Sequence, residues 1–236
     1  MSSSLNDPIG QAILDYDQTN KSIDIIVESD ICEDDIIPSE YFFRSFNEMP
    51  KIEQEALKRC AGKTLDVGAA AGTHANYLKK KGIDVTCIDI SAKSVDFLKS
   101  QNYSAERINF FDIEGKEYDT LLMLMNGIGI AGKLSNLEYT LIKAKSLLVS
   151  GGKLLCDSSD IKFLYEDDKG AMWVDLNTAY YGDFKFNMTY KEHTSGWFDW
   201  LYVDFKNFEK IALKVGFSVE KIIDIDDQYL VELIKN

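Results

Sequence analysis

The feature that most constrains the fold is a regular alternation of short apolar runs and amphipathic segments between residues 63 and 156. The apolar runs predict short buried strands at 64–67, 85–90, 106–110, 120–125 and 153–156. Between them, apolar residues at helical spacing predict helices at 73–81, 92–100 and 134–148. This order of elements is typical of an α/β fold with a doubly wound, mainly parallel sheet.

After residue 157 the pattern changes. The segments that follow predict an antiparallel hairpin of aromatic strands at 183–190 and 197–203, a helix at 205–215, and two strands at 218–225 and 228–234. Only Asp226 and Asp227 separate the last two strands, a connection too short for a parallel crossover. The sequence therefore predicts a seven-stranded sheet with an antiparallel last strand pair, and a β-hairpin inserted at about 180–203.

The first fifty residues differ from the rest in charge. They hold eleven Asp and Glu against Lys21 and Arg44, a net −9, which leaves −4 of the total −13 for the other 186 residues. A short alternating apolar run at 23–27 and an aromatic cluster at 41–43 also lie here. We interpret residues 1–50 as an N-terminal acidic cap segment rather than a separate domain. Residues 51–236 then form the main domain, which begins with a helix after Pro50.

Composition excludes several classes of protein. Hydrophobic residues make up 45% of the chain, enough for a sizeable core. The acidic balance argues against nucleic acid as a partner, because nucleic-acid affinity depends largely on Lys and Arg. Four scattered cysteines without a CxxC pair indicate reduced thiols and no metal site. The first ten residues lack a basic stretch followed by an apolar run, and no apolar stretch could cross a bilayer, so we expect a cytoplasmic protein without membrane contact.

The strongest chemical signal is the small-residue turn between the first strand and helix of the sheet, Leu-Asp-Val-Gly-Ala-Ala-Ala-Gly-Thr at 65–73. Small residues let the backbone approach a ligand closely at this point of a doubly wound sheet. Asp89, at the end of the second strand, lies twenty-one residues after Gly68. At that spacing an acidic side chain can accept hydrogen bonds from both hydroxyls of a ribose. Turn and acid together predict a nucleotide-type cofactor.

With these residues the chain resembles the class I S-adenosylmethionine-dependent methyltransferases, over roughly residues 40–236. The family's glycine-rich turn maps onto Asp66, Gly68, Ala70 and Gly72, with Ala70 in place of the usual middle glycine. The resemblance implies that S-adenosylmethionine is the cofactor. It also implies further cofactor-binding residues: Asp89 with Ile90 at the ribose, Asp112 at the adenine amino group with Phe111 or Ile113 as apolar wall, and Met125, Asn126 and Gly127 lining the methyl-transfer pocket.

Other site residues are suggested by residue type and position. Arg44 is the only Lys or Arg between residues 22 and 50 and could bind the cofactor's carboxylate, although a surface pair with Glu40 or Glu48 would explain it equally well. His74, in the first turn of a helix, could approach the methionine end of the cofactor or merely cap that helix. Tyr41, beside Arg44, belongs to a set of aromatic residues that could cover the pocket or pack the core. The others are Phe42, Phe43, Tyr180, Tyr181, Trp197, Phe198, Trp200 and Tyr202.

No catalytic residue is assigned, and two candidates for a general base remain. Asp157 follows the fifth strand, where open α/β sheets place ligands, but turn formation with Ser158 and Ser159 is the favoured alternative. His193 lies at the expected tip of the hairpin, where a solvated loop residue is the alternative.

These observations favour a methyltransferase acting on oxygen or nitrogen of a small-molecule acceptor. A neutral or cationic acceptor is expected, because an acidic cap over the entrance would repel an anion. One alternative is an S-adenosylmethionine-binding protein without transferase activity. Another is an NAD-dependent oxidoreductase, but its Gly-x-Gly-x-x-Gly fingerprint is incomplete here. Asn126 is followed by Gly127 and Ile128 rather than by the Pro-Pro-aromatic sequence common in enzymes that methylate DNA bases.

Overall fold

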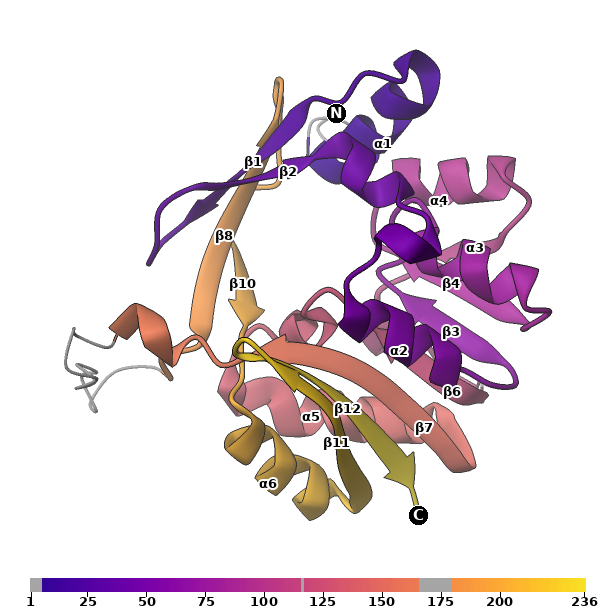
Figure 1. The fold of residues 1–236 in the computed structure, drawn as a ribbon, viewed down its shortest axis with the longest axis vertical. Coiled ribbons are helices and arrows are strands. Elements are labelled where there is room, and N and C mark those ends of the chain that lie inside the picture. The colour runs from indigo at the N-terminus through magenta and orange to yellow at the C-terminus, as the bar shows by residue number, and fades with distance from the viewer. Residues whose placement is uncertain (1–5, 116, 166–179) are drawn as a thin grey trace.

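The computed structural model describes residues 6–115, 117–165 and 180–236. Its main sheet has seven strands in the order β11-β12-β7-β6-β3-β4-β5 (Figure 1). The strands are β3 (Thr64–Val67), β4 (Val85–Asp89), β5 (Ser104–Arg107), β6 (Tyr118–Met123), β7 (Leu148–Ser159), β11 (Phe217–Ile225) and β12 (Gln228–Lys235). Strands β3 to β7 pair in parallel, whereas β12 runs antiparallel to both β7 and β11. The predicted fold class is thus confirmed.

Helices cover both faces of this sheet (Figure 1). They are α2 (Lys51–Arg59), α3 (Thr73–Lys80), α4 (Ala92–Ser100), α5 (Leu134–Ser146) and α6 (Phe205–Val215). The central strand β6 explains how both faces are filled, because its side chains alternate between two cores. Leu121 and Met123 lie in the core beneath α5 and α6, whereas Leu122 lies in the core beneath α2 and α3. None of the described helices is long and apolar enough to cross a membrane.

Several strand boundaries differ from the predicted ones: β6 spans Tyr118–Met123 instead of 120–125, and the causes are clearest for the third and fifth strands. The third strand was expected at 106–110, but β5 ends at Arg107. The cause is Asn109, whose side chain accepts a hydrogen bond from Phe111 N and starts the 3-10 helix η3 (Phe110–Asp112). The fifth strand was expected at 153–156, but β7 spans Leu148–Ser159 because pairing with β12 continues to its end, where Gln228 faces Ser159. Pairing with a neighbouring strand is a tertiary effect that local pattern does not report.

The inserted hairpin forms as predicted, and it belongs to a second sheet that the sequence analysis missed. The order is β10-β8-β1-β2, with β9 also paired to β8. Its strands are β1 (Asp24–Ser29), β2 (Asp35–Pro38), β8 (Asp183–Tyr190), β9 (His193–Thr194) and β10 (Phe198–Leu201). In Figure 1 β1 and β8 lie side by side although they are far apart in sequence, with Val27 opposite Met188. The cap segment and the insertion thus share one antiparallel sheet.

Helix α1 (Pro8–Thr19) fastens this second sheet to the main domain by packing along α4. Asp7 caps α1 by accepting from Gly10 N, and its other oxygen accepts from the Ser91 hydroxyl, directly after β4. A third core forms between α1, β1 and α4. It consists of Ala12, Ile13, Ile25, Phe42, Phe97 and Tyr190. The cap segment is therefore packed against the same end of the sheet as the glycine-rich turn.

Candidate cofactor-binding site

The glycine-rich turn between β3 and α3 has the left-handed backbone that its composition predicts. Gly68 and Gly72 have φ values of 73° and 79°, and a Cβ on Gly72 would lie 2.6 Å from Leu98 Cδ2. Ala70 takes the same left-handed conformation at φ 47° despite its side chain. With Ala71 it packs against the third core, which includes Phe42. The alanine in place of the family's middle glycine thus adds to the packing of the turn against this core.

Asp89 closes this turn from the end of β4. Its Oδ2 accepts from Ala70 N at 2.9 Å, and its Oδ1 accepts from Ser91 N at 2.8 Å. Burial raises the pKa of Asp89 above its ordinary value, against the opposing effect of these backbone hydrogen bonds. The next residue, Ile90, is 70% exposed, which leaves a large apolar side chain uncovered beside the turn. Ile90, Arg107, Ile108 and Asn109 line a surface depression of about 350 Å³.

The segment expected to contact adenine divides into two environments. Asp112 is exposed at the end of η3, where a ligand can reach it. Phe111 stacks on Tyr139 with ring centroids 5.6 Å apart. Ile113 differs from the expectation, because its side chain is only 2% exposed and is part of the main core. It therefore presents no open apolar wall, and the exposed Ile90 is better placed for that role.

A buried cluster of charged side chains lies beside the turn. Arg44 Nη2 donates to Glu53 at 3.0 Å (Oε1) and 2.8 Å (Oε2), so its partner is neither Glu40 nor Glu48. His74 Nε2 lies 2.8 Å from Glu53 Oε2, and its Nδ1 lies 3.9 Å from Asp66 Oδ1. The Arg44 guanidinium also stacks on the Tyr41 ring, with Cζ 3.3 Å from the centroid. The structure thus brings together four residues that the sequence suggested, around a glutamate that it did not.

Three polar atoms of this cluster are buried without a hydrogen-bond partner among the described residues: Arg44 Nε, Arg44 Nη1 and Asp66 Oδ2. Burial raises the pKa of Asp66 to about 6. Burial lowers the pKa of His74, but its hydrogen bond to Glu53 and the charge of Asp66 outweigh this, so the net shift is upward. Unsatisfied buried donors and acceptors are rare in folded proteins, so these atoms are candidates for pairing with a bound ligand. Here Arg44 offers two hydrogen-bond donors to an anion, and Asp66 offers an acceptor to a cation.

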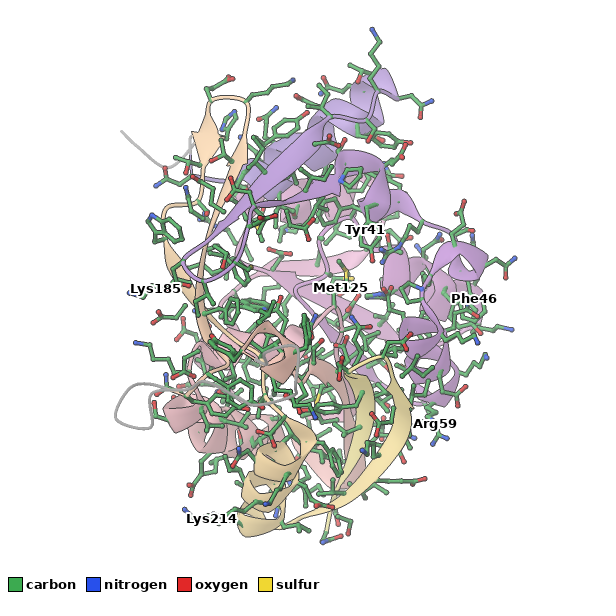
Figure 2. All side chains as sticks on the ribbon, turned by 60° about the vertical axis from the view of Figure 1, so that its left-hand side comes forward. Tyr41, Phe46, Arg59, Met125, Lys185 and Lys214 are labelled. Carbon is green, nitrogen blue, oxygen red and sulfur yellow. The ribbon has the colours of Figure 1, made fainter. Side chains whose placement is uncertain are left out.

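The loop after β6 lies next to this cluster. Met125 and Asn126 are two consecutive non-glycine residues with left-handed backbone, at φ 63° and 55°, an arrangement that concentrates at functional sites. Met125 Sδ is 3.9 Å from Arg44 Nη2, and Figure 2 shows Met125 close to Tyr41 near the middle of the molecule. Asp157 holds the loop, because its two oxygens accept from Asn126 N at 3.0 Å and Gly127 N at 3.3 Å. Asp157 therefore positions the predicted methyl-transfer loop.

The two candidates for a general base are placed very differently. Burial raises the pKa of Asp157 to about 6, but both its oxygens already accept backbone hydrogen bonds. His193 is buried in β9 opposite Tyr190, and β9 packs against α1. It is not the solvated tip residue considered above, because β9 continues the pairing along β8 beyond β10 and leaves only Lys191 and Glu192 in the turn. No described contact brings His193 to the glycine-rich turn or to the 125–127 loop.

The raised pKa of Asp157 makes a testable contribution to stability. Because its folded pKa of about 6 exceeds the ordinary value of 3.8, this contribution is fully present below about pH 4 and is lost as pH rises through 6. We expect the unfolding free energy of the wild type, relative to that of Asp157→Asn, to fall by about 2–3 kcal/mol between pH 4 and 7. Urea titrations of both proteins across this range measure the difference. Parallel pH profiles would show that Asp157 is not the titrating group.

The expected aromatic cover is only partly present. Phe42 and Phe43 pack in or against the third core, and the hydroxyls of Tyr180 and Tyr181 donate to Asp204 and Asp160. On the second sheet, Trp200 lies so close to Gly129 that a Cβ there would overlap the indole ring. Neighbouring rings continue the surface in a network of tilted and edge-to-face contacts, formed by Phe184, Phe186, Phe198 and Tyr202. Strand β10 packs against η4 (Gly127–Ala131), the 3-10 helix after Asn126. We call Trp200 and these neighbouring rings the aromatic wall.

Glu53 is the main residue that sequence reasoning missed. A signal was available, because Glu53 follows Ile52 and precedes Ala56 and Leu57 on the apolar side of α2. A carboxylate within such an apolar stripe is buried only when it is paired. Asp7 was also missed, since its contact with Ser91 depends on where α1 docks.

A doubly wound sheet whose glycine-rich turn, second-strand acid and buried charged cluster meet at one edge defines a Rossmann-like enzyme that binds a nucleoside cofactor. Comparison with known proteins specifies the family. Residues 36–126 match the family model "Tellurite resistance protein TehB". None of the curated proteins matches the sequence.

Solved structures extend the likeness to the whole chain. A S-adenosylmethionine-dependent methyltransferase from Bacteroides fragilis, crystallised with S-adenosyl-L-homocysteine, is 38% identical, with a TM-score of 0.91 over 99% of this chain and 97% of that one. The CcbJ methyltransferase from Streptomyces caelestis is 14% identical, with a TM-score of 0.59 over 80% and 94%. The sugar N-methyltransferase KedS8 from Streptoalloteichus is 13% identical, with a TM-score of 0.54 over 83% and 88%. These last two share the fold.

The chain belongs to the class I S-adenosylmethionine-dependent methyltransferases. The predicted enzyme class and cofactor are confirmed at the level of the family, and the nicotinamide alternative is set aside.

Proposed function

We propose that this protein transfers a methyl group from S-adenosylmethionine to oxygen or nitrogen of a small, neutral or cationic acceptor. The observation that carries the proposal is the set of buried, unpartnered atoms beside the glycine-rich turn, Arg44 Nε and Nη1 and Asp66 Oδ2. An amino-acid group carries one carboxylate and one ammonium, and these atoms are complementary to both. Few other metabolites combine such a group with a nucleoside.

The residues that would hold the cofactor follow from this match. Arg44 would bind the carboxylate and Asp66 the ammonium, with His74 and Tyr41 packed around them. Asp89 would accept from the ribose hydroxyls, Ile90 would cover one adenine face and Asp112 would accept from the adenine amino group. The backbone of Gly68, Ala70 and Gly72 would lie along the cofactor, and Met125, Asn126 and Gly127 would face its methyl group.

Little covalent chemistry is required of the protein. S-adenosylmethionine supplies a methyl group that is already activated by its sulfonium. The chain's own contribution is to hold the acceptor in line with that methyl and to exclude water. Asp157 fixes the 125–127 loop through two backbone hydrogen bonds, and Trp200 packs directly against Gly129 in the 3-10 helix that continues from this loop. A loop held in this way is suited to alignment.

The surroundings of the aromatic wall support the acceptor class. Burial is the largest cause that raises the pKa of the Tyr202 hydroxyl to about 12, and the nearby Cys32, Asp35 and Asp157 act in the same direction. Aromatic rings beside carboxylates favour cations and neutral planar groups over anions. The net −9 of the first fifty residues, which supply β1 and β2 of the same sheet, acts in the same direction.

We also propose that the protein acts in the cytoplasm and does not bind nucleic acid. All four cysteines are free thiols, which supports a reducing compartment such as the cytoplasm. The net charge of −13 disfavours binding to nucleic acid. We therefore propose a soluble metabolite as the acceptor.

The experiment is a transfer assay with methyl-labelled S-adenosylmethionine and separate pools of amines, alcohols and phenols, carboxylates, and nucleotides. We expect label in the amine or hydroxyl pools. Trp200→Ala should lose transfer while S-adenosylhomocysteine binding persists, and Trp197→Ala, which alters a tryptophan that is 56% exposed, is the matched control. Cofactor binding without transfer to any pool would favour a binding protein, and label in the carboxylate or nucleotide pools alone would refute the proposed acceptor class.

A further inference from the structure

Glu53 connects three separate parts of the molecule at the candidate cofactor site. It lies in the first turn of α2 and is 3% exposed. Arg44 follows the 3-10 helix η1 (Ser39–Phe43) of the cap, and His74 lies in the first turn of α3. Both side chains contact the same carboxylate, at 2.8 Å to Oε2 in each case. One buried acid thus joins the cap segment to the helix that follows the glycine-rich turn.

The contacts of Arg44 determine which of its donors stay available. Tyr41 stacks on the guanidinium and fixes its plane, while Glu53 accepts only from Nη2. Nε and Nη1 are left buried and without a partner among the described residues. Because Glu53 accepts from Nη2 alone, the ion pair orients the guanidinium and leaves Nε and Nη1 available to a ligand.

A buried guanidinium requires a counterion to remain buried. The Arg44 side chain is 9% exposed, so a short displacement would bring it to water. Within the described part of the chain, Glu53 is the carboxylate that forms an ion pair with Arg44. Without this charge, release of the Arg44 side chain to solvent becomes the favourable outcome.

We propose that Glu53 is a positioning residue that holds Arg44 ready for the carboxylate of the cofactor's amino-acid group. This inference rests on the proposed cofactor site and adds a residue to it. Glu53 acts on binding through Arg44 and does not itself touch the cofactor. It also explains why a carboxylate lies on the apolar side of α2, since Arg44 and His74 both contact it there.

The test compares two ligands by titration calorimetry. S-adenosylhomocysteine carries the amino-acid group, and 5′-methylthioadenosine shares the nucleoside thioether but lacks that group. In Glu53→Gln we expect S-adenosylhomocysteine affinity to fall about tenfold or more, with 5′-methylthioadenosine affinity within about twofold of the wild type. Glu55→Gln is the matched control, because Glu55 lies on the same helix and forms only partly exposed pairs with Lys58 and Arg59.

A double variant separates positioning from a general structural role. If Glu53 acts through Arg44, then Glu53→Gln should cause no further loss of S-adenosylhomocysteine affinity in an Arg44→Ala background. Equal losses for both ligands, additive losses in the double variant, or unchanged affinity in Glu53→Gln would overturn the inference. A wild-type protein that binds neither ligand would instead refute the proposed cofactor site, so the two failures are distinguishable.

Discussion

Asp89→Ala should weaken S-adenosylhomocysteine binding by about 2–3 kcal/mol, roughly a 30- to 150-fold rise in Kd. Two ribose hydroxyls would lose a charged acceptor. The turn itself would also loosen, because Asp89 accepts from Ala70 N and Ser91 N in the protein as described. Titration calorimetry on the purified variant gives the affinity directly.

The control for this experiment is Asp96→Ala. Asp96 is an exposed aspartate on the nearby helix α4, and its replacement removes the same charge without touching the turn. Unfolding free energies of both variants show how much of the loss comes from the loosened turn. Affinity equal to that of the wild type in Asp89→Ala would remove Asp89 from the site.

Arg44→Ala should lower the free energy of unfolding by about 3–5 kcal/mol even without ligand, the cost of leaving a buried carboxylate unpaired. Glu53 is that carboxylate, and of its partners among residues 6–115, 117–165 and 180–236 it would keep His74. Replacing both residues, Arg44→Ala with Glu53→Gln, removes the unpaired charge and should recover part of the loss. Urea denaturation of the two single variants and the double variant completes the cycle.

Lys214→Ala provides the comparison for an exposed ion pair. Lys214 pairs with Glu138 at 2.6 Å, but the two side chains are 66% and 42% exposed, so the loss should be within about 1 kcal/mol. An Arg44→Ala variant as stable as Lys214→Ala would mean that Glu53 is hydrated or protonated in the native protein. In that case Glu53 would not require Arg44 as its counterion.

Local pattern predicted the main sheet well because its signals are short in range. Strands β3, β4 and β6 are apolar runs bounded by turn residues, and the two-residue link before β12 excludes a parallel crossover. The second sheet escaped prediction because its strands come from both ends of the chain. Val27 and Met188 are partners across β1 and β8, and neither local pattern contains information about the other.

In the candidate site, too, contacts between residues close in sequence could be predicted, whereas contacts that depend on packing could not. Asp89 and the turn at 68–72 are close in sequence as well as in space, so their spacing was sufficient to pair them. Ile113, the alternative to Phe111 as apolar wall, proved to be buried, because the side on which a side chain lies after η3 depends on packing with the core. Arg44 was identified because it is the only Lys or Arg between residues 22 and 50. Its partner, Glu53, could not be identified in this way, because the contact forms only when α2 packs against the cap segment.

The sequence by itself indicated the class of fold, a candidate turn for a nucleoside cofactor and a resemblance to the family, because strand alternation, small-residue turns and an acid at fixed spacing are local properties of the chain. Only the tertiary structure decided that the cap segment and the insertion share one sheet, and that the Asp157 side chain binds backbone N–H groups of the 125–127 loop. The contacts that join Arg44 and His74 through Glu53 also depend on it. These features depend on burial, since an unpaired charge or donor costs much free energy only where water is excluded.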